Sequence, residues 1–252
     1  MNGLGSSSLL PLLLIWKGEL IVGQPGCSSI LLLGFIRTKA PVAIRCALQE
    51  LRQEIANDSY FAGVPSIKRA THYFHAKDDI PEVRERVFRL LHGLDFKAEF
   101  IVARKIEKIF VGRHKKQENV FYDDLIVKLF QNKLHVTKEN QIYFAVRGNT
   151  TRQEFLTNAI QTAILSFEKK WATTIDSVIK VQAQTMTGEP CLQVADYMNW
   201  AVQRAFIRGD IRFLDFVRNR ISCLVDVYDF ANYPHNFYTS KNSFDVNKIS
   251  PL

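Results

Sequence analysis

Two apolar runs near the start of the chain constrain the fold most strongly. The first extends from Leu9 to Val22 and the second from Ile30 to Ile36, and the stretch GQPGCSS between them is rich in the turn formers Gly and Pro. Short apolar runs on either side of a turn predict two buried strands that pair as an antiparallel hairpin. We therefore expect a sheet that begins with this hairpin, after a disordered leader over residues 1–8.

Helical and strand patterns alternate along the rest of the chain. A helix is expected from Pro41, because apolar residues recur at the helical period from Ile44 to Ile55. This alternation predicts the α/β class, with a mixed sheet and helices on both faces. No shift in composition marks a boundary, so one domain is expected over residues 9–252. Further helices are expected to start at Asp79, Glu118, Thr151 and Pro190, and further strands over residues 96–103, 141–147 and 177–184.

The segment before the second helix has its own local signals. Tyr73 and Phe74 are typical of a short strand, and Asp79 stands where the helix should begin. Because Glu82 follows three residues later, the pair predicts a capping box.

Net charge and cysteine spacing restrict the class of protein. The chain of 252 residues has a formal net charge of +8, which favours a polyanionic partner such as nucleic acid. Its four cysteines are far apart and lack metal-site spacing, so we expect no structural zinc and a reducing compartment. No basic residue precedes the apolar run that starts at Leu9, which argues against a signal peptide. The run is also too short for a membrane-spanning helix, which takes about 20 residues. A cytoplasmic location is expected.

An aspartate within an apolar helix is the first candidate for chemistry. The stretch Leu192 to Arg204 is helical by period, and Asp196, Asn199 and Gln203 form a polar strip along one border of its apolar half. A buried carboxylate without a partner costs several kcal/mol. Asp196 is therefore expected either at a solvated edge, which periodicity alone favours, or lining a cleft.

A second candidate is the segment HAKDD, which contains His75, Asp78 and Asp79. It lies where a strand is expected to end and a helix to begin, and α/β proteins place sites in such loops. Two carboxylates and an imidazole suit Mg²⁺ or Mn²⁺. The alternative is structural, with Asp79 as a helix cap and His75 as hydrogen-bonded scaffolding.

Two basic regions are candidates for phosphate contact. The first is the stretch from Arg104 to Lys116, which includes Lys105, and the second is Arg147, which precedes a helix N-terminus. Either region could equally face water or pair with acids. The segment Tyr122 to Asp124 is expected to be a solvated helix face. We find no P-loop, dinucleotide fingerprint, GxSxG elbow or HExxH motif.

Five segments, taken in order, resemble the domain-of-unknown-function family 3800, whose members are bacterial and phage proteins with a ribonuclease H-like fold. The resemblance extends from about Gly18 to Phe244. The segments are FHAKDDIPEVRERVF, FYDDLIVKLF, IYFAVR, LQVADYMNWAVQR and DVYDFANYPHNFYTSKNSF.

This resemblance implies a ribonuclease H-like arrangement, in which acids from the first strand and a late helix hold two divalent cations around a phosphate. The late-helix acid would be Asp196. One departure concerns the first strand, because Ile15 and Trp16 stand where the family has Asp and Glu. Glu19 is the acid that remains there. Either Glu19 substitutes for the first-strand acid, or the chain has lost its first metal ligand.

The sequence therefore predicts a nuclease of RNA or DNA that depends on Mg²⁺ or Mn²⁺ and is impaired by the change at Ile15. Asp196 and Asp78 would be the metal ligands. His75 and Asp79 would be supporting groups, and Glu19 would be the remaining catalytic acid of the first strand. Gln193 would be a nearby polar contact to the substrate, and Lys105 and Arg147 would contact phosphate. The alternative is a non-catalytic module that keeps the fold and binds nucleic acid or protein. A metal requirement separates the two.

Overall fold

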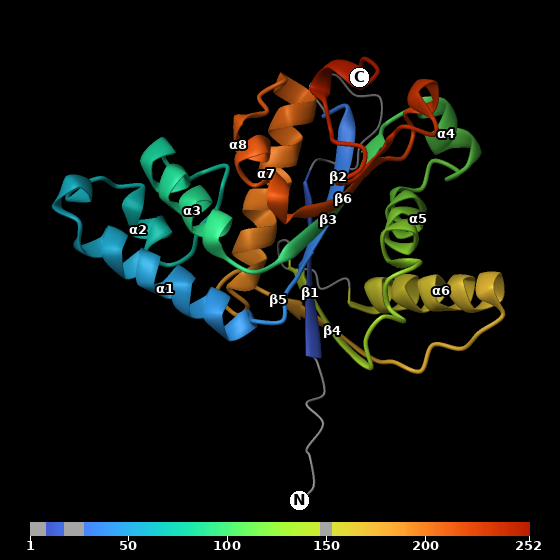
Figure 1. Cartoon of the computed structure of the whole chain (residues 1–252), viewed down its shortest axis with the longest axis horizontal. Helices are drawn as coiled ribbons and strands as arrows, with labels where there is room; N and C mark the ends of the chain where they lie inside the picture. Colours follow the sequence, from blue (N-terminus) through green and yellow to red (C-terminus); the bar gives the residue numbers. More distant parts are fainter. Residues whose placement is uncertain (1–8, 18–27, 147–152) are drawn as a thin grey trace, which may run out of the picture.

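A computed structural model of the chain describes residues 9–17, 28–146 and 153–252, with side chains from residue 28 onward. Within these residues the strands form one seven-stranded sheet in the order β5-β4-β1-β2-β3-β6-β7 (Figure 1). The strands are β1 (Leu9–Lys17), β2 (Ile30–Arg37), β3 (Lys97–Arg104), β4 (Glu139–Ala145), β5 (Val178–Gln184), β6 (Ile221–Asp226) and β7 (Phe237–Tyr238).

The predicted N-terminal hairpin is present. β1 and β2 pair in antiparallel register, with Ile15 opposite Gly34. β3 runs antiparallel to β2, and the remaining long strands pair in parallel, β4 with β1, β5 with β4 and β6 with β3. Five strands therefore run in one direction, namely β1, β3, β4, β5 and β6. Their carboxyl ends lie at the same end of the sheet.

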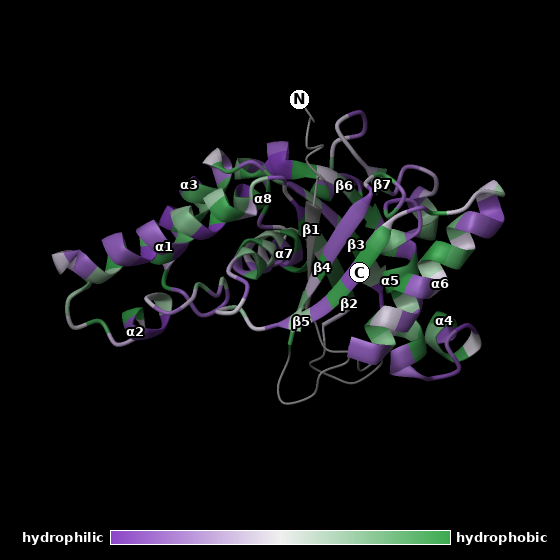
Figure 2. Cartoon of the chain, turned by 90° about the horizontal axis from the view of Figure 1, so that it is seen from below, coloured by the Kyte–Doolittle hydropathy of each residue, from purple (hydrophilic) through white to green (hydrophobic). Residues whose placement is uncertain are grey.

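Helices cover both faces of the sheet, so the predicted α/β class with a mixed sheet is confirmed. The side chains of β2 alternate between two apolar cores: Leu32 packs with α1, α3 and α7, whereas Leu33 packs with α5 and α6. Figure 2 shows these helix groups on opposite sides of the sheet. The helices are α1 (Pro41–Asn57), α2 (Ile67–Ala70), α3 (Pro81–Gly93), α4 (Glu107–Gly112), α5 (Glu118–Phe130), α6 (Gln153–Trp171), α7 (Cys191–Arg208) and α8 (Arg212–Phe216).

Helix α7 lies unusually close to the sheet at Gly34. A methyl group at this position would stand 2.4 Å from the Phe100 ring and 2.5 Å from Oδ1 of Asn199 on α7. Glycine within a strand often marks such a close approach of a neighbouring element. The missing side chain therefore lets α7 cross directly over β2.

Three local predictions are wrong. Tyr73 and Phe74 form an irregular segment, not a strand. Asp79 does not cap α3, which begins after Ile80 without a side-chain cap, because the Asp79 carboxylate is bound elsewhere. The expected solvated face from Tyr122 to Asp124 lies on α5, where Tyr122 points into the core and is buried, while Asp123 and Asp124 are partly exposed.

Two other predictions concern residues outside the described ranges. The leader over residues 1–8 and the cap at Thr151 fall outside the described ranges. The helix expected from Thr151 is α6, which ends at Trp171 as expected. In the part of the chain that the structure describes, no helix has both the length and the apolar character needed to cross a bilayer.

The contact at Gly34 can be tested by adding one methyl group. Gly34→Ala should lower the free energy of unfolding by about 1–3 kcal/mol, because Phe100 and Asn199 must both shift. Urea unfolding of the parent and the variant measures this change.

Gly93→Ala is the matched control. Its methyl group would meet no atom within 4 Å at the end of α3, so it should leave stability unchanged or raise it by about 0.4–1 kcal/mol. Equal stability of Gly34→Ala and the parent would show that α7 is not held at this distance.

Candidate functional site

Asp196 is buried, and its environment corrects the prediction of a solvated helix edge. Its exposed fraction is 1%, because α7 is covered on all sides from Cys191 to Val202. The carboxylate Oδ2 accepts a hydrogen bond of 2.8 Å from the backbone N–H of Ala76. Asp196 thus fixes the loop that contains the HAKDD segment.

Gln193, one turn earlier on α7, binds the same loop. Its Oε1 accepts from the backbone N–H of Phe74 at 3.0 Å, and its Nε2 donates to the carbonyl of Met186 at 2.8 Å. Residues three apart on a helix share one face. This face of α7 therefore supplies two acceptors to consecutive parts of the segment from Phe74 to Asp79, which we call the 74–79 loop.

The buried carboxylate of Asp79 binds within the loop instead of capping α3. It accepts hydrogen bonds from the backbone N–H of His75 at 2.8 Å and from the hydroxyl of Tyr197 at 2.6 Å. Nη2 of Arg69 completes the set at 3.1 Å. Burial, together with the negative charge of Asp79, raises the pKa of Tyr197 well above its usual value, so the hydroxyl stays protonated and donates.

Arg84 holds the carbonyl groups of the same loop. Its Nε donates to Ala76 O at 2.8 Å and its Nη2 donates to Asp79 O. The guanidinium lies 4.6 Å from the centre of the Trp200 ring, and Arg204 lies 4.9 Å from that ring. Cation–π contacts of this kind stabilise a partly buried arginine. The loop is thus bound through both its donors and its acceptors.

The fixed loop presents His75 between two carboxylates. Nδ1 of His75 is 3.1 Å from Oδ2 of Asp78, within ion-pair distance but outside hydrogen-bond alignment. Nε2 is 3.9 Å from Oδ1 of Asp196. The Asp78 side chain is exposed and the imidazole is partly exposed, whereas Asp196 is buried. An exposed acid, an imidazole and a buried acid therefore form one line from the surface inward.

The two predicted metal ligands, Asp78 and Asp196, lie beside different atoms of the His75 ring. In the described residues no group of three or more His, Cys, Asp and Glu side chains has the arrangement of a metal site. Because the imidazole ring stands between Asp78 and Asp196, these two carboxylates do not bind one cation by themselves. The pair that fits a shared cation best is Asp196 with Nε2 of His75, since carboxylate and imidazole suit Mn²⁺.

The remaining predicted residues lie elsewhere. Lys105 lies at the carboxyl end of β3, in a cavity of about 340 Å³ lined by Ser29, Tyr228 and Asp229 but by no residue of the 74–79 loop or α7. Glu19 and Arg147 fall outside the described residues. The structure therefore brings together His75, Asp78, Asp79, Gln193 and Asp196, and it separates Lys105 from them.

One buried ionic cluster was not identified from the sequence. Arg104, counted above as part of a basic stretch, is buried and donates to Asp226 at 2.9 Å and to Asp229 at 3.0 Å. Burial raises the pKa of Asp226, and the hydrogen bond from Arg104 opposes that change. In the sequence, the two acids three residues apart in DVYDF could have indicated a partner for a buried arginine. This cluster holds the end of β6 against β3.

Tyr197→Phe tests how firmly the loop is held. The variant keeps the ring but removes the hydroxyl donor from a buried carboxylate, so the free energy of unfolding should fall by about 1.5–3 kcal/mol. Thermal and urea unfolding measure it. Tyr60→Phe, at an exposed ring just after the end of α1, should change stability by less than about 0.5 kcal/mol. Equal effects of the two variants would refute the role given to Tyr197.

Comparison with models of known protein families finds no match to this chain, and a search of curated proteins finds none either. The family resemblance thus stays a prediction from the sequence.

Proposed function

We propose that this protein is a nuclease-type protein on a ribonuclease H-like fold, which binds RNA or DNA and hydrolyses phosphodiester bonds with the help of Mg²⁺ or Mn²⁺. The observation that carries the proposal is the 74–79 loop. Five side-chain-to-backbone hydrogen bonds fix it, and it places His75 and Asp78 beside Asp196. Catalytic groups need such pre-organisation by surrounding side chains.

The arrangement of elements supports this proposal. α7, the late helix that contains Asp196, packs against β1 and β2, so the late helix and the first strand are neighbours. The ribonuclease H-like fold brings acids from these two elements together. The net charge of +8 adds a general attraction for a phosphate backbone.

The residues of the site have separate tasks in this proposal. Asp196 and Nε2 of His75 would hold a divalent cation, and a bound cation supplies charge neutralisation at the phosphate and activation of water. Asp78 lies beside Nδ1 of His75, where its negative charge favours a proton on that nitrogen and leaves Nε2 as the basic atom. Asp79, Gln193 and Arg84 keep the loop in place and do not touch the substrate.

A second function, a nucleic-acid-binding module without catalysis, is favoured by one observation. Ile15 stands opposite Gly34, at the part of the first strand where the family has an acid. Asn199 on α7 lies against Gly34, so α7 approaches the sheet at this register. A site that lacks its first-strand acid has lost one negative charge for holding a cation. Binding would then persist without metal.

The nuclease proposal is tested with Asp196→Asn, which is a better variant than Asp196→Ala. The amide oxygen of Asn can still accept from Ala76 N–H, whereas Ala leaves this buried donor unpaired at a cost of about 1–3 kcal/mol. Cleavage of labelled single-stranded RNA and DNA is measured with Mn²⁺ and with EDTA. Asp196→Asn should reduce the rate by roughly a hundredfold or more without changing stability.

Asp176→Asn is the control, because it removes an exposed carboxylate that lies before β5. It should cut at the parental rate. Cleavage by Asp196→Asn as fast as by the parent, or cleavage that persists in EDTA, would rule out the proposed site.

The binding-module alternative makes a different prediction. The parent would bind the same strands in EDTA without cutting them, with an affinity that falls steeply as salt rises. If Lys105 contacts phosphate, Lys105→Ala should weaken binding and reduce the slope of log affinity against log salt by about 1. Lys169→Ala, at the end of α6, serves as the control. An unchanged slope for Lys105→Ala would remove this residue from the interface.

A further inference from the structure

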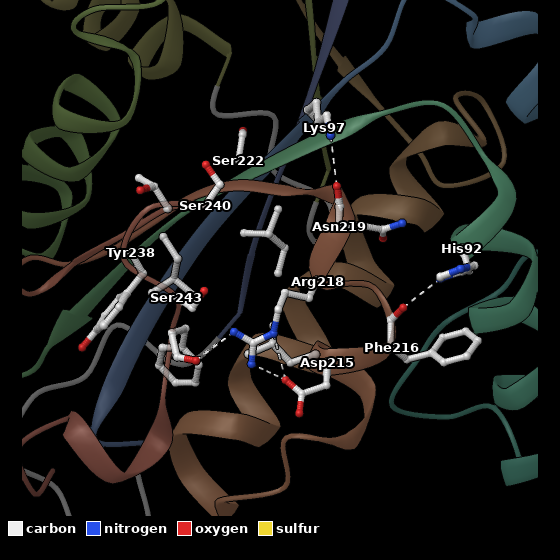
Figure 3. A pocket seen from close by; sticks show the side chains of 15 residues that line it. His92, Lys97, Asp215, Phe216, Arg218, Asn219, Ser222, Tyr238, Ser240 and Ser243 are labelled. Atoms are coloured by element: carbon white, nitrogen blue, oxygen red, sulfur yellow. Dashed lines mark hydrogen bonds and ion pairs between the residues drawn. The ribbon is translucent and has the colours of Figure 1, made fainter.

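A large pocket lies away from the 74–79 loop, at the amino ends of β3 and β6. Its volume is about 630 Å³, within the range of roughly 300–1,000 Å³ that is usual for sites of small molecules. α8, β6, β7 and the segment after β7 surround it (Figure 3). None of the residues assigned to the proposed nuclease site lines it.

The base of the pocket is apolar. Leu214, Leu224 and Phe244 line it, and all three are buried, with exposed fractions of 1%, 1% and 7%. The Phe244 ring packs against the rings of Phe206 and Tyr238, whose centres are each 5.1 Å away. A rigid apolar base of this kind favours a ligand with an apolar body.

Of the cations that line the pocket, Lys97 is the one without a carboxylate partner in the described chain. Arg218 also lines the pocket, but it pairs with Asp215 and donates to the carbonyl of Phe244 at 2.9 Å. Nζ of Lys97 makes one hydrogen bond there, to Asn219 O at 3.0 Å, and an ammonium group has three donors. With His92 neutral, the lining therefore has one positive charge in excess.

Hydroxyl groups supply the remaining polar contacts. Figure 3 shows Ser222, Ser240 and Ser243 on one side of the pocket, with Phe216 and His92 on the other. Ser222 donates to Ala98 O, which leaves its oxygen as an acceptor. Nδ1 of His92 donates to the carbonyl of Phe216, so Nε2 of the neutral ring is an acceptor. The lining can thus bind donors as well as an anion.

We propose that this pocket binds a small organic anion with an apolar ring-sized body and a single carboxylate or phosphate group. The body lies on Leu214, Leu224 and Phe244, the anionic group contacts Lys97, and the serine hydroxyls bind further polar atoms of the ligand. This site is independent of the proposed nuclease site, because the two share no residue. The two proposals therefore stand or fall separately.

The first experiment uses two fluorescent probes of similar shape on the full chain. Anilinonaphthalene sulfonate has an apolar body and one negative charge, whereas phenylnaphthylamine is its neutral counterpart. The parent should bind the sulfonate saturably at one site. Lys97→Met should weaken the sulfonate about tenfold, as expected for the loss of one charge-assisted hydrogen bond, and should leave phenylnaphthylamine binding unchanged. Lys108→Met, on exposed α4, should affect neither probe.

A second variant blocks the pocket itself. Ser240→Trp places an indole at an exposed position of the wall, so the fold should be retained and binding of both probes should be lost. Ser59→Trp, also at an exposed serine, controls for the added ring and should bind as the parent does. Unfolding curves verify that both variants fold. Equal sulfonate binding by Ser240→Trp and the parent would overturn the proposal, and so would the absence of saturable binding to the parent.

Competition then separates the two anionic groups. Salicylate and phenyl phosphate are each titrated against the bound sulfonate probe, with benzyl alcohol as the neutral comparison. Displacement by either anion at concentrations at which benzyl alcohol has no effect supports the site, and the stronger competitor identifies the group it prefers. Displacement by benzyl alcohol as effective as by both anions would overturn the role of Lys97.

Discussion

The close contact of α7 with β2 is the constraint on which the rest of the structure depends. It exists because residue 34 has no side chain, so Asn199 and Phe100 can occupy the space that a methyl group would fill. Once α7 lies there, its earlier turns are buried between the sheet on one side and α1 and the 74–79 loop on the other. A buried helix turn that contains Gln193 and Asp196 must find hydrogen-bond partners for both side chains. The backbone of the 74–79 loop supplies those partners.

The loop and the helix therefore depend on each other. The loop has no regular structure, and its N–H groups are bound by Gln193, Asp196 and Asp79 in place of a strand neighbour. In return, those N–H groups allow a carboxylate to be buried in an apolar core. Asp196 has a structural task that is independent of any chemistry. A variant at this position must separate the two, which is why the amide replacement is more informative than alanine.

The sequence predicted the parts of the fold that follow from local patterns. Strong period signals identified the hairpin, the helix from Pro41 and the strand that contains Ile179, Val181 and Ala183, whose side chains do pack together on one face. The Asp79 cap failed because local spacing cannot reveal a competing partner such as Tyr197, 118 residues away. The burial of Asp196 and the partners of Arg104 likewise depend on tertiary contacts. The sequence did identify the loop residues His75, Asp78 and Asp79 and the helix residues Gln193 and Asp196, which the structure brings together.

The two edge strands of the sheet, β5 and β7, affect whether copies of this protein aggregate at high concentration. β7 at one end pairs with β6 through only two residues, and β5 at the other end exposes alternate side chains. Lys180 is among the exposed side chains of β5, and its ammonium group pairs with Glu139 on β4. A very short strand and a lysine on an edge both hinder the addition of a strand from another molecule. The sheet therefore ends in two features that oppose edge-to-edge aggregation, although neither contributes to the candidate site.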